Sequence, residues 1–258
     1  MNTELDGRST VVVGASRGLG RGIADVFAAA GARVVAIARS APGDLAADVP
    51  FEVADVPFEV ADVRFEAADA ADPATPPRIL ATYQPEILVV VAGATPVSRP
   101  LHEHTWDTFS VHWHSDVKIA FGWVREALVR PLPPGSRVIV VSSGAAVNGS
   151  AVSGGYAGAK ATQRFIAAYA QDESGRAGLG ITFTTVLPVM TPAGGVGQEG
   201  IRAYAARSGR TPADFVAGLG EPLTAETAGA AVVELVRSDP AGLAPGYLLT
   251  AAGLQKLP

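Results

Sequence analysis

The sequence contains no cysteine among its 258 residues, which excludes disulfides, thiolate nucleophiles and cysteine metal sites. Charged residues make up only 17%, and the net charge of −5 comes without a basic run, which argues against nucleic acid or an anionic membrane as partner. The apolar stretches, such as residues 87–92, are far shorter than a membrane span. Residues 1–8 are polar and offer no signal-peptide core, so we expect a cytoplasmic protein.

Hydrophobic residues, in contrast, make up 48% of the chain, enough for a sizeable core. Apolar runs predict strands at residues 10–13, 33–38, 87–92, 137–141 and 181–186. Helical spacing predicts helices at residues 21–30, 106–129 and 156–171. This alternation indicates an α/β fold: a doubly wound, Rossmann-type parallel sheet with helices on both faces, in a single domain over residues 1–258.

A short tandem repeat interrupts this pattern. The heptapeptide VPFEVAD at residues 49–55 recurs at 56–62, and a looser copy, VRFEAAD, follows at 63–69. Copies this short do not form a solenoid, so we interpret them as a local duplication that lengthened a loop or a strand end. We expect Asp69 to mark the end of the third strand, because the acidic stretch that it begins runs into Pro73.

A glycine-rich turn lies between the first predicted strand and the first predicted helix. It reads GASRGLG and contains Gly14, Ser16, Arg17, Gly18, Leu19 and Gly20. A helix N-terminus offers free N–H groups, and glycines let a pyrophosphate approach the backbone. The strand–turn–helix context therefore predicts a dinucleotide-binding site.

The end of the second predicted strand indicates which dinucleotide binds. An NAD site places an acidic residue there, whereas this chain has Ala38 followed by Arg39 and Ser40. A guanidinium can pair with a ribose 2′-phosphate, and Arg17 could add a second cation, with Ser16 and Ser40 as hydrogen-bond donors. We therefore predict that NADP(H) is the cofactor.

A candidate catalytic group follows the strand predicted at residues 137–141. Tyr156 and Lys160 are four residues apart at the start of a predicted helix, so they share one helix face. A neighbouring ammonium stabilises a phenolate, which suits proton exchange with a carbonyl or alcohol oxygen. Ser143 follows residues 137–141, at the sheet edge where chemistry gathers in parallel sheets.

These residues together resemble the short-chain dehydrogenase/reductase family over nearly the whole chain. Its glycine pattern falls on Gly14, Gly18 and Gly20, and its serine, tyrosine and lysine fall on Ser143, Tyr156 and Lys160. The resemblance implies an NADPH-dependent carbonyl reductase or alcohol dehydrogenase. In it Tyr156 exchanges the proton, Lys160 binds the nicotinamide ribose and tunes Tyr156, and Ser143 polarises the carbonyl.

The resemblance also implies further contacts with the cofactor and with partner subunits. Asp69 and the backbone of Ala70 would contact adenine, Ala92 and Gly93 would line the cofactor, and Pro188 and Thr191 would flank the nicotinamide. Homodimers or homotetramers would form through the helices at residues 106–129 and 156–171.

Four positions depart from the family pattern. Residues 90–93 read Val-Val-Ala-Gly where the family often has Asn-Asn-Ala-Gly, and Val189 replaces a glycine. Asp116 aligns with an asparagine that usually completes a proton relay, and it is the fourth candidate catalytic residue. A non-redox reaction (isomerisation, dehydration or cyclisation) and a non-catalytic NADP-binding role therefore stay open as alternatives.

The four histidines lie close together in sequence, as His102, His104, His112 and His114. Residues two apart on a helix point to different faces, so we expect no metal site. His112, one turn before Asp116, would lie either near the active site or in the core. Residues 189–222 are expected to form a substrate lid whose mixed apolar residues indicate a small to medium, partly apolar ketone or alcohol: Met190, Pro192, Val196, Ile201, Tyr204 and Phe215.

Overall fold

The computed structural model describes residues 5–41, 63–192 and 194–258. These residues form an eight-stranded sheet in the order β3-β2-β1-β4-β5-β6-β7-β8. Every neighbouring pair is parallel except β7 and β8, which are antiparallel. The strands are β1 (Ser9–Val13), β2 (Arg33–Ala38), β3 (Val63–Ala67), β4 (Ile87–Val90), β5 (Arg137–Val141), β6 (Thr182–Pro188), β7 (Gly246–Thr250) and β8 (Gly253–Lys256).

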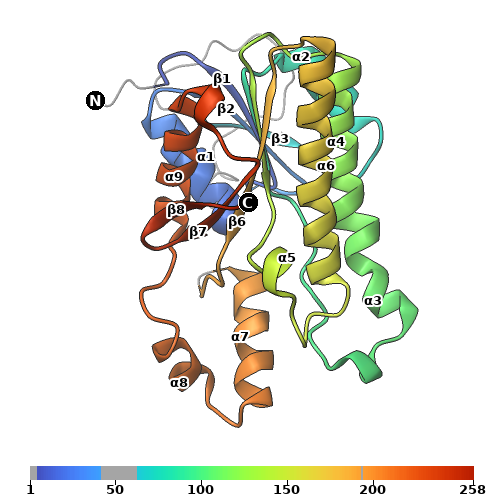
Figure 1. Ribbon diagram of the computed structural model, residues 1–258, viewed down its shortest axis with the longest axis vertical. Helices are drawn as coiled ribbons and strands as arrows, with labels where there is room; N and C mark the ends of the chain where they lie inside the picture. The colour runs from blue at the N-terminus through green and yellow to red at the C-terminus, as the bar shows by residue number, and fades with distance from the viewer. Residues whose placement is uncertain (1–4, 42–62, 193) are drawn as a thin grey trace.

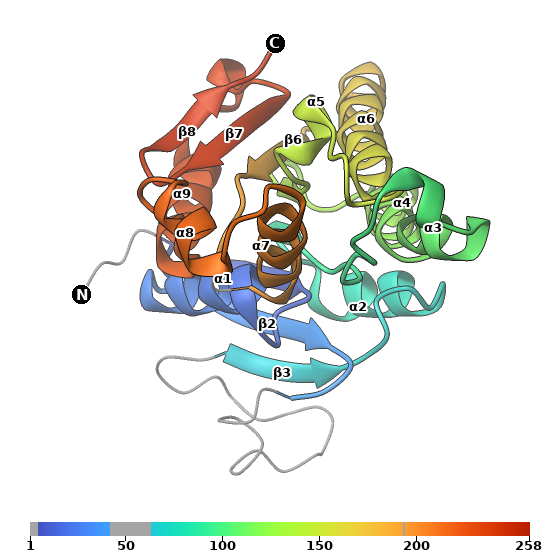
Figure 2. The ribbon, with the colours of Figure 1, turned by 90° about the horizontal axis from the view of Figure 1, so that it is seen from below.

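Helices cover both faces of the sheet, as the sequence predicts (Figures 1 and 2). On one face lie α1 (Gly18–Ala29) and α9 (Ala225–Arg237); on the other lie α2 (Thr75–Tyr83), α4 (Lys118–Val129) and α6 (Tyr156–Ala177). The remaining helices are α3 (Trp106–His112), α5 (Ala145–Asn148), α7 (Gly195–Arg207) and α8 (Pro212–Ala217), with short 3₁₀ turns at Leu101–Glu103 and Pro240–Gly242.

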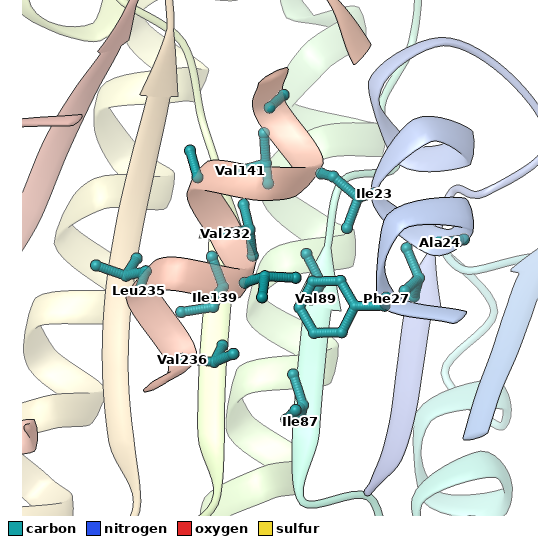
Figure 3. Packing of buried hydrophobic residues seen from close by; sticks show 14 of the residues in the cluster. Ile23, Ala24, Phe27, Ile87, Val89, Ile139, Val141, Val232, Leu235 and Val236 are labelled. Atoms are coloured by element: carbon teal, nitrogen blue, oxygen red, sulfur yellow. The ribbon is translucent and has the colours of Figure 1, made fainter. Parts of the chain in front are cut away.

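The central strands are almost wholly apolar because both of their faces are buried. Alternate residues of β4 belong to different cores: Val89 packs with the α1 and α9 side chains, and Leu88 with those of α2, α4 and α6. Figure 3 shows Phe27 from α1 and Val232 from α9 meeting over Val89. A side chain on Gly229 would lie 2.7 Å from Val26, so glycine allows α1 and α9 to pack closely.

The strand order reverses direction at the centre of the sheet. From β1 the chain first builds outward through β2 and β3, and then returns to place β4 on the other side of β1. In such sheets ligands bind where the order reverses, beyond the carboxyl ends of the strands. The fold therefore directs attention to the ends of β1 and β4.

The long helix predicted at residues 106–129 is not one regular helix. It consists of α3, a π-helical segment at Trp113–Val117, and α4. Apolar spacing does not distinguish a π turn from an α turn over five residues, so the sequence prediction was wrong in this detail. The π segment carries Asp116, and such segments often occur at functional sites.

The repeat is described only in part. Its first two copies, residues 49–55 and 56–62, lie outside the described residues. The third copy contains β3 at Val63–Ala67, and Asp69 follows two residues later, at the predicted end of the third strand. Within the described residues, no helix is long and apolar enough to cross a membrane.

Candidate active site

A cavity of about 960 Å³ opens beyond the carboxyl ends of the central strands. It brings together residues from the turn after β1, the ends of β2, β4, β5 and β6, the start of α6, and the helices α7 and α8. All predicted site residues line it: Gly14, Ser16, Arg17, Gly18, Leu19, Gly20, Arg39, Ser40, Asp69, Ala70, Ala92, Gly93, Asp116, Ser143, Tyr156, Lys160, Pro188 and Thr191.

The glycine-rich turn packs closely against the loop after β4. Gly14 has φ +94°, and its N–H donates to the carbonyl of Ile37 at 2.7 Å. A side chain on Gly14 would lie 2.6 Å from the backbone of Ala92, so no larger residue fits there. The N-cap residue of α1, Arg17, makes no side-chain cap. The first N–H groups of α1 are therefore available to an anion in the cavity.

The cavity beside the end of β2 is cationic. Arg39 and Ser40 are exposed there, and Arg17 faces the same space from the turn. Among the described residues that line the cavity, the carboxylates are Asp69 and Asp116, and neither follows β2. Asp69 follows β3 and accepts a hydrogen bond from the N–H of Ala71 at 3.0 Å.

Tyr156 opens α6, and Lys160 lies one turn further along it. The Lys160 ammonium is 5.5 Å from the centre of the Tyr156 ring, which matches the predicted shared face. Ser143 follows β5, and its Oγ accepts from the N–H of Ala145 at 3.2 Å. The neighbouring Ser142 is buried and donates to the carbonyl of Lys160 at 2.8 Å, which fastens the start of α6 to the end of β5.

Asp116 is fully buried and is the centre of a polar cluster. Its Oδ1 lies 3.1 Å from the Lys160 ammonium. Its Oδ2 accepts from the Ser115 hydroxyl at 2.7 Å and from the Ala94 N–H at 2.9 Å, and lies 3.1 Å from Nδ1 of His112. The hydrogen bond from Ala94 connects Asp116 to the loop after β4, in which the asparagines of the family pattern are absent.

Burial by itself would raise the pKa of Asp116, but the Lys160 charge, His112 and the Ala94 N–H outweigh it and hold that pKa well below its ordinary value. Burial by itself would lower the pKa of Lys160, but Asp116 and Tyr156 outweigh it and raise that pKa. Asp116 and Lys160 therefore form a buried ion pair at neutral pH.

His112 lies both in the core and beside the candidate active site, the two environments between which the sequence did not decide. Its side chain is buried, and its ring packs edge-on against Tyr156 with 5.0 Å between the ring centres. The spacing of four residues between His112 and Asp116 in the sequence indicated the contact between these two side chains. Ser115 and Ser142, which hold Asp116 and α6, were not identified from the sequence, although each directly precedes a candidate catalytic residue.

In the described part of the chain, no three His, Asp or Glu side chains lie close enough together to hold a metal ion. Of the residues expected to form a substrate lid, Met190, Val196, Tyr204 and Phe215 line the cavity, whereas Pro192 and Ile201 do not. Ile201 is buried instead, so it supports α7 from its inner side.

Comparisons with known proteins agree with this arrangement. A family model described as short chain dehydrogenase matches residues 8–202. No protein of curated function matches the sequence. A short chain dehydrogenase from Burkholderia cenocepacia J2315, solved in complex with NADP, has a similar fold with a TM-score of 0.73 and 23% identity; the match covers 94% of this chain and 96% of that one. One from Mycobacterium avium has a TM-score of 0.70 and 21% identity, covering 99% of this chain and 85% of that one.

Proposed function

The chain belongs to the short chain dehydrogenase family, and from this premise we propose that it is an NADPH-dependent carbonyl reductase, or the reverse alcohol dehydrogenase. The observation that carries the proposal is one cavity lined by the glycine-rich turn together with Ser143, Tyr156 and Lys160. We further propose that residues 1–258 form a single domain and that residues 189–222 act as its substrate lid.

The residues present fit the cofactor. The uncapped start of α1 leaves N–H donors for a pyrophosphate in the cavity. Arg17 and Arg39 would pair with the 2′-phosphate, with Ser16 and Ser40 beside them. Asp69 and Ala70 would contact adenine, and Ala92, Gly93, Pro188 and Thr191 would lie along the nicotinamide half.

In this proposal NADPH, when bound, supplies the hydride that the carbonyl carbon accepts. Tyr156 donates its hydroxyl proton to the carbonyl oxygen, and Ser143 donates a hydrogen bond to the same oxygen. The Lys160 ammonium stabilises the phenolate that remains, and Tyr156 regains a proton from solvent. A ketone thus gains one hydride at carbon and one proton at oxygen to become an alcohol.

The direct test is NADPH oxidation, followed by absorbance, with a panel of uncharged ketones. We expect consumption of NADPH and formation of the matching alcohol in equal amounts. If the purified protein binds NADPH but consumes none with any ketone or, in reverse, forms none with any alcohol, the redox assignment is wrong.

One observation favours a second candidate, a non-redox reaction on the same fold. Lys160 pairs with a carboxylate, Asp116, where the family pattern has an amide. A carboxylate there lowers the net positive charge beside Tyr156. An isomerase, dehydratase or cyclase would convert its substrate with no net use of NADPH, which product analysis distinguishes from reduction.

Cofactor preference provides a separate prediction. Arg39→Asp places a carboxylate at the end of β2, where it would repel a 2′-phosphate and accept from a ribose hydroxyl. Because charged hydrogen bonds contribute about 1.5–3 kcal/mol, we expect NADPH to bind roughly 10- to 100-fold more weakly and NADH to bind more tightly. Titration of cofactor fluorescence measures both affinities.

Arg207→Asp is the matched control, because it makes the same charge change on an exposed residue outside the cavity. It should leave both affinities unchanged. An unaltered NADPH preference in Arg39→Asp would contradict the assignment of the 2′-phosphate to this strand end.

Exposed aromatic side chains support assembly into homodimers or homotetramers. Trp106 and Phe121, on α3 and α4, and Phe165 and Tyr169, on α6, are each more than half exposed, and both α3 and α4 contact α6. Exposed apolar side chains on neighbouring elements commonly mark protein interfaces. In sedimentation experiments we expect the unchanged protein to have a mass that is a multiple of 26.3 kDa, and Phe165→Lys to have a mass closer to that of the single chain.

A further inference from the structure

The part of the cavity beyond Ser143 and Tyr156 is lined by neutral side chains. They come from the loop after β4, the segment before α6, and the lid helices, and include Ser98, Ser150, Ser153, Met190, Tyr204 and Phe215. This is where a substrate carbonyl would have to enter to reach Tyr156. An inference about the substrate from these residues rests on the proposed function.

No free charge faces this space from the described residues that line the cavity. Arg17, Arg39 and Asp69 lie at the cofactor end, and Asp116 and Lys160 pair with each other. Arg210 does not line the cavity; its guanidinium lies over the Phe215 ring, 5.9 Å from the ring centre, and donates to the carbonyl of Asp214. A carboxylate or phosphate on the substrate would be taken out of water with no partner, which is unfavourable.

One wall of this space is a pair of stacked aromatic rings. The rings of Tyr204 and Phe215 are nearly parallel, at 10°, with 6.1 Å between their centres. The Tyr204 hydroxyl lies 2.7 Å from Oγ of Ser150, a hydrogen bond that fixes the ring against the segment before α6. Rings held in this way favour a flat aromatic ligand over a flexible chain.

Two hydroxyls at this end lack a partner. Oγ of Ser98 and Oγ of Ser153 are buried and make no hydrogen bond, and Ser153 is only 7% exposed. Arg99, the residue after Ser98, pairs with Ser153 in a parallel bridge, so the backbones of the two serines lie near each other. The carbonyl of Ser153 accepts from the N–H of Tyr156 at 3.1 Å, so this pair lies beside the reacting group.

A buried hydroxyl without a partner is unfavourable, and a ligand oxygen would satisfy it. The aromatic wall and the absence of charge restrict what can carry that oxygen. We infer that the substrate is an uncharged aromatic ketone with a second neutral oxygen, a hydroxyl or carbonyl, which Ser98 and Ser153 bind while the ring lies against Tyr204 and Phe215.

The test uses four related ketones with the intact protein and NADPH. These are 1-tetralone, 6-hydroxy-1-tetralone, the corresponding 6-carboxylate, and 1-decalone, whose rings are saturated. We expect kcat/KM to be highest for the hydroxytetralone, about 3- to 10-fold above tetralone for one added hydrogen bond. Tetralone should exceed decalone by a similar factor, and the carboxylate should be the poorest.

Two variants separate the contributions. Ser153→Ala should remove the preference for the hydroxyl without changing the preference of tetralone over decalone. Phe215→Leu should remove the preference for tetralone over decalone without changing the preference for the hydroxyl. Calorimetric titration of the hydroxytetralone into protein saturated with NADP⁺ gives the same comparison by binding, with no turnover required.

The outcomes distinguish this inference from the proposed function. If NADPH is consumed with decalone or the carboxylate as readily as with hydroxytetralone, the substrate class is wrong and the redox function stands. If hydroxytetralone binds, and binds more weakly to Ser153→Ala, but no ketone is reduced, the pocket assignment stands and the redox function is wrong. Equal ketone preferences in Ser153→Ala and the unchanged protein would overturn the role of Ser153.

Discussion

Replacement of Tyr156 by phenylalanine is expected to lower kcat for ketone reduction by about 10²- to 10⁴-fold, the range typical of a lost general acid. The change removes one oxygen atom and keeps the ring, so its packing against His112 at 5.0 Å should persist. Affinity for NADPH should change little, because the glycine-rich turn and Arg39 are untouched. Stopped-flow turnover and cofactor titration measure the two quantities separately.

The expected size of this effect follows from the surroundings of the hydroxyl. Tyr156 is the titratable side chain in the cavity whose ring lies beside the Lys160 ammonium, at 5.5 Å from the ring centre. A phenolate formed there is stabilised by the neighbouring cation. In the proposed mechanism Ser143 only donates a hydrogen bond to the carbonyl oxygen, so it does not replace Tyr156 as the proton donor. Without the hydroxyl, proton transfer would depend on water that reaches the site.

Tyr169→Phe is the matched control. Tyr169 lies on the same helix, is 63% exposed and does not line the cavity, so its loss of a hydroxyl should leave kcat unchanged. Product formation lost in Tyr156→Phe with no net NADPH consumption in the unchanged protein would favour the non-redox candidate. An unchanged activity in Tyr156→Phe would point to a non-catalytic NADP-binding protein.

Much of the fold could be predicted because its signals are local. The strands β2 and β5 begin and end where apolar runs do, at Arg33–Ala38 and Arg137–Val141. The glycine-rich turn is recognisable because backbone conformation itself requires glycine at Gly14. Likewise, a spacing of four residues on one helix suffices to bring Tyr156 and Lys160 together.

The surroundings of Asp116 could not be predicted in the same way. Its partners come from a π-helical segment, from α6 and from the loop after β4, and only the fold brings these together. The sequence identified the residue as a departure but not its consequence. Likewise, Ile201 and Met190 are both apolar residues of the segment 189–222, and nothing local shows that Ile201 supports α7 while Met190 lines the cavity.

Asp116→Asn is the change for which we expect the largest loss of stability, even though asparagine matches the family pattern at this position. Lys160, the Ala94 N–H and the Ser115 hydroxyl all face the two carboxylate oxygens. An amide has one oxygen, so its NH₂ group would have to face one of these donors. It would also leave the buried Lys160 ammonium without a counter-charge.

Breaking a buried ion pair by removing one partner costs about 3–5 kcal/mol, which urea unfolding at neutral pH would measure as a lower free energy of unfolding. Asp25→Asn is the control, because Asp25 pairs with Arg21 on the surface of α1, and its loss should cost no more than about 1 kcal/mol. Equal effects of the two substitutions would contradict a buried, charged pair.

The pH dependence of the Asp116→Asn effect tests the charge state directly. The pKa of Asp116 is depressed in the folded protein, so its contribution to stability is present above the ordinary value of 3.8 and is lost as pH falls toward the folded value. The pKa of Lys160 is raised, so its contribution is present below the ordinary value of 10.5 and is lost as pH rises through the folded value. The stability difference between the two proteins should therefore be largest between these limits and should shrink in acid. A difference that grows as pH falls below 3.8 would mean that Asp116 is protonated in the folded protein, and that Lys160 is held by some other group.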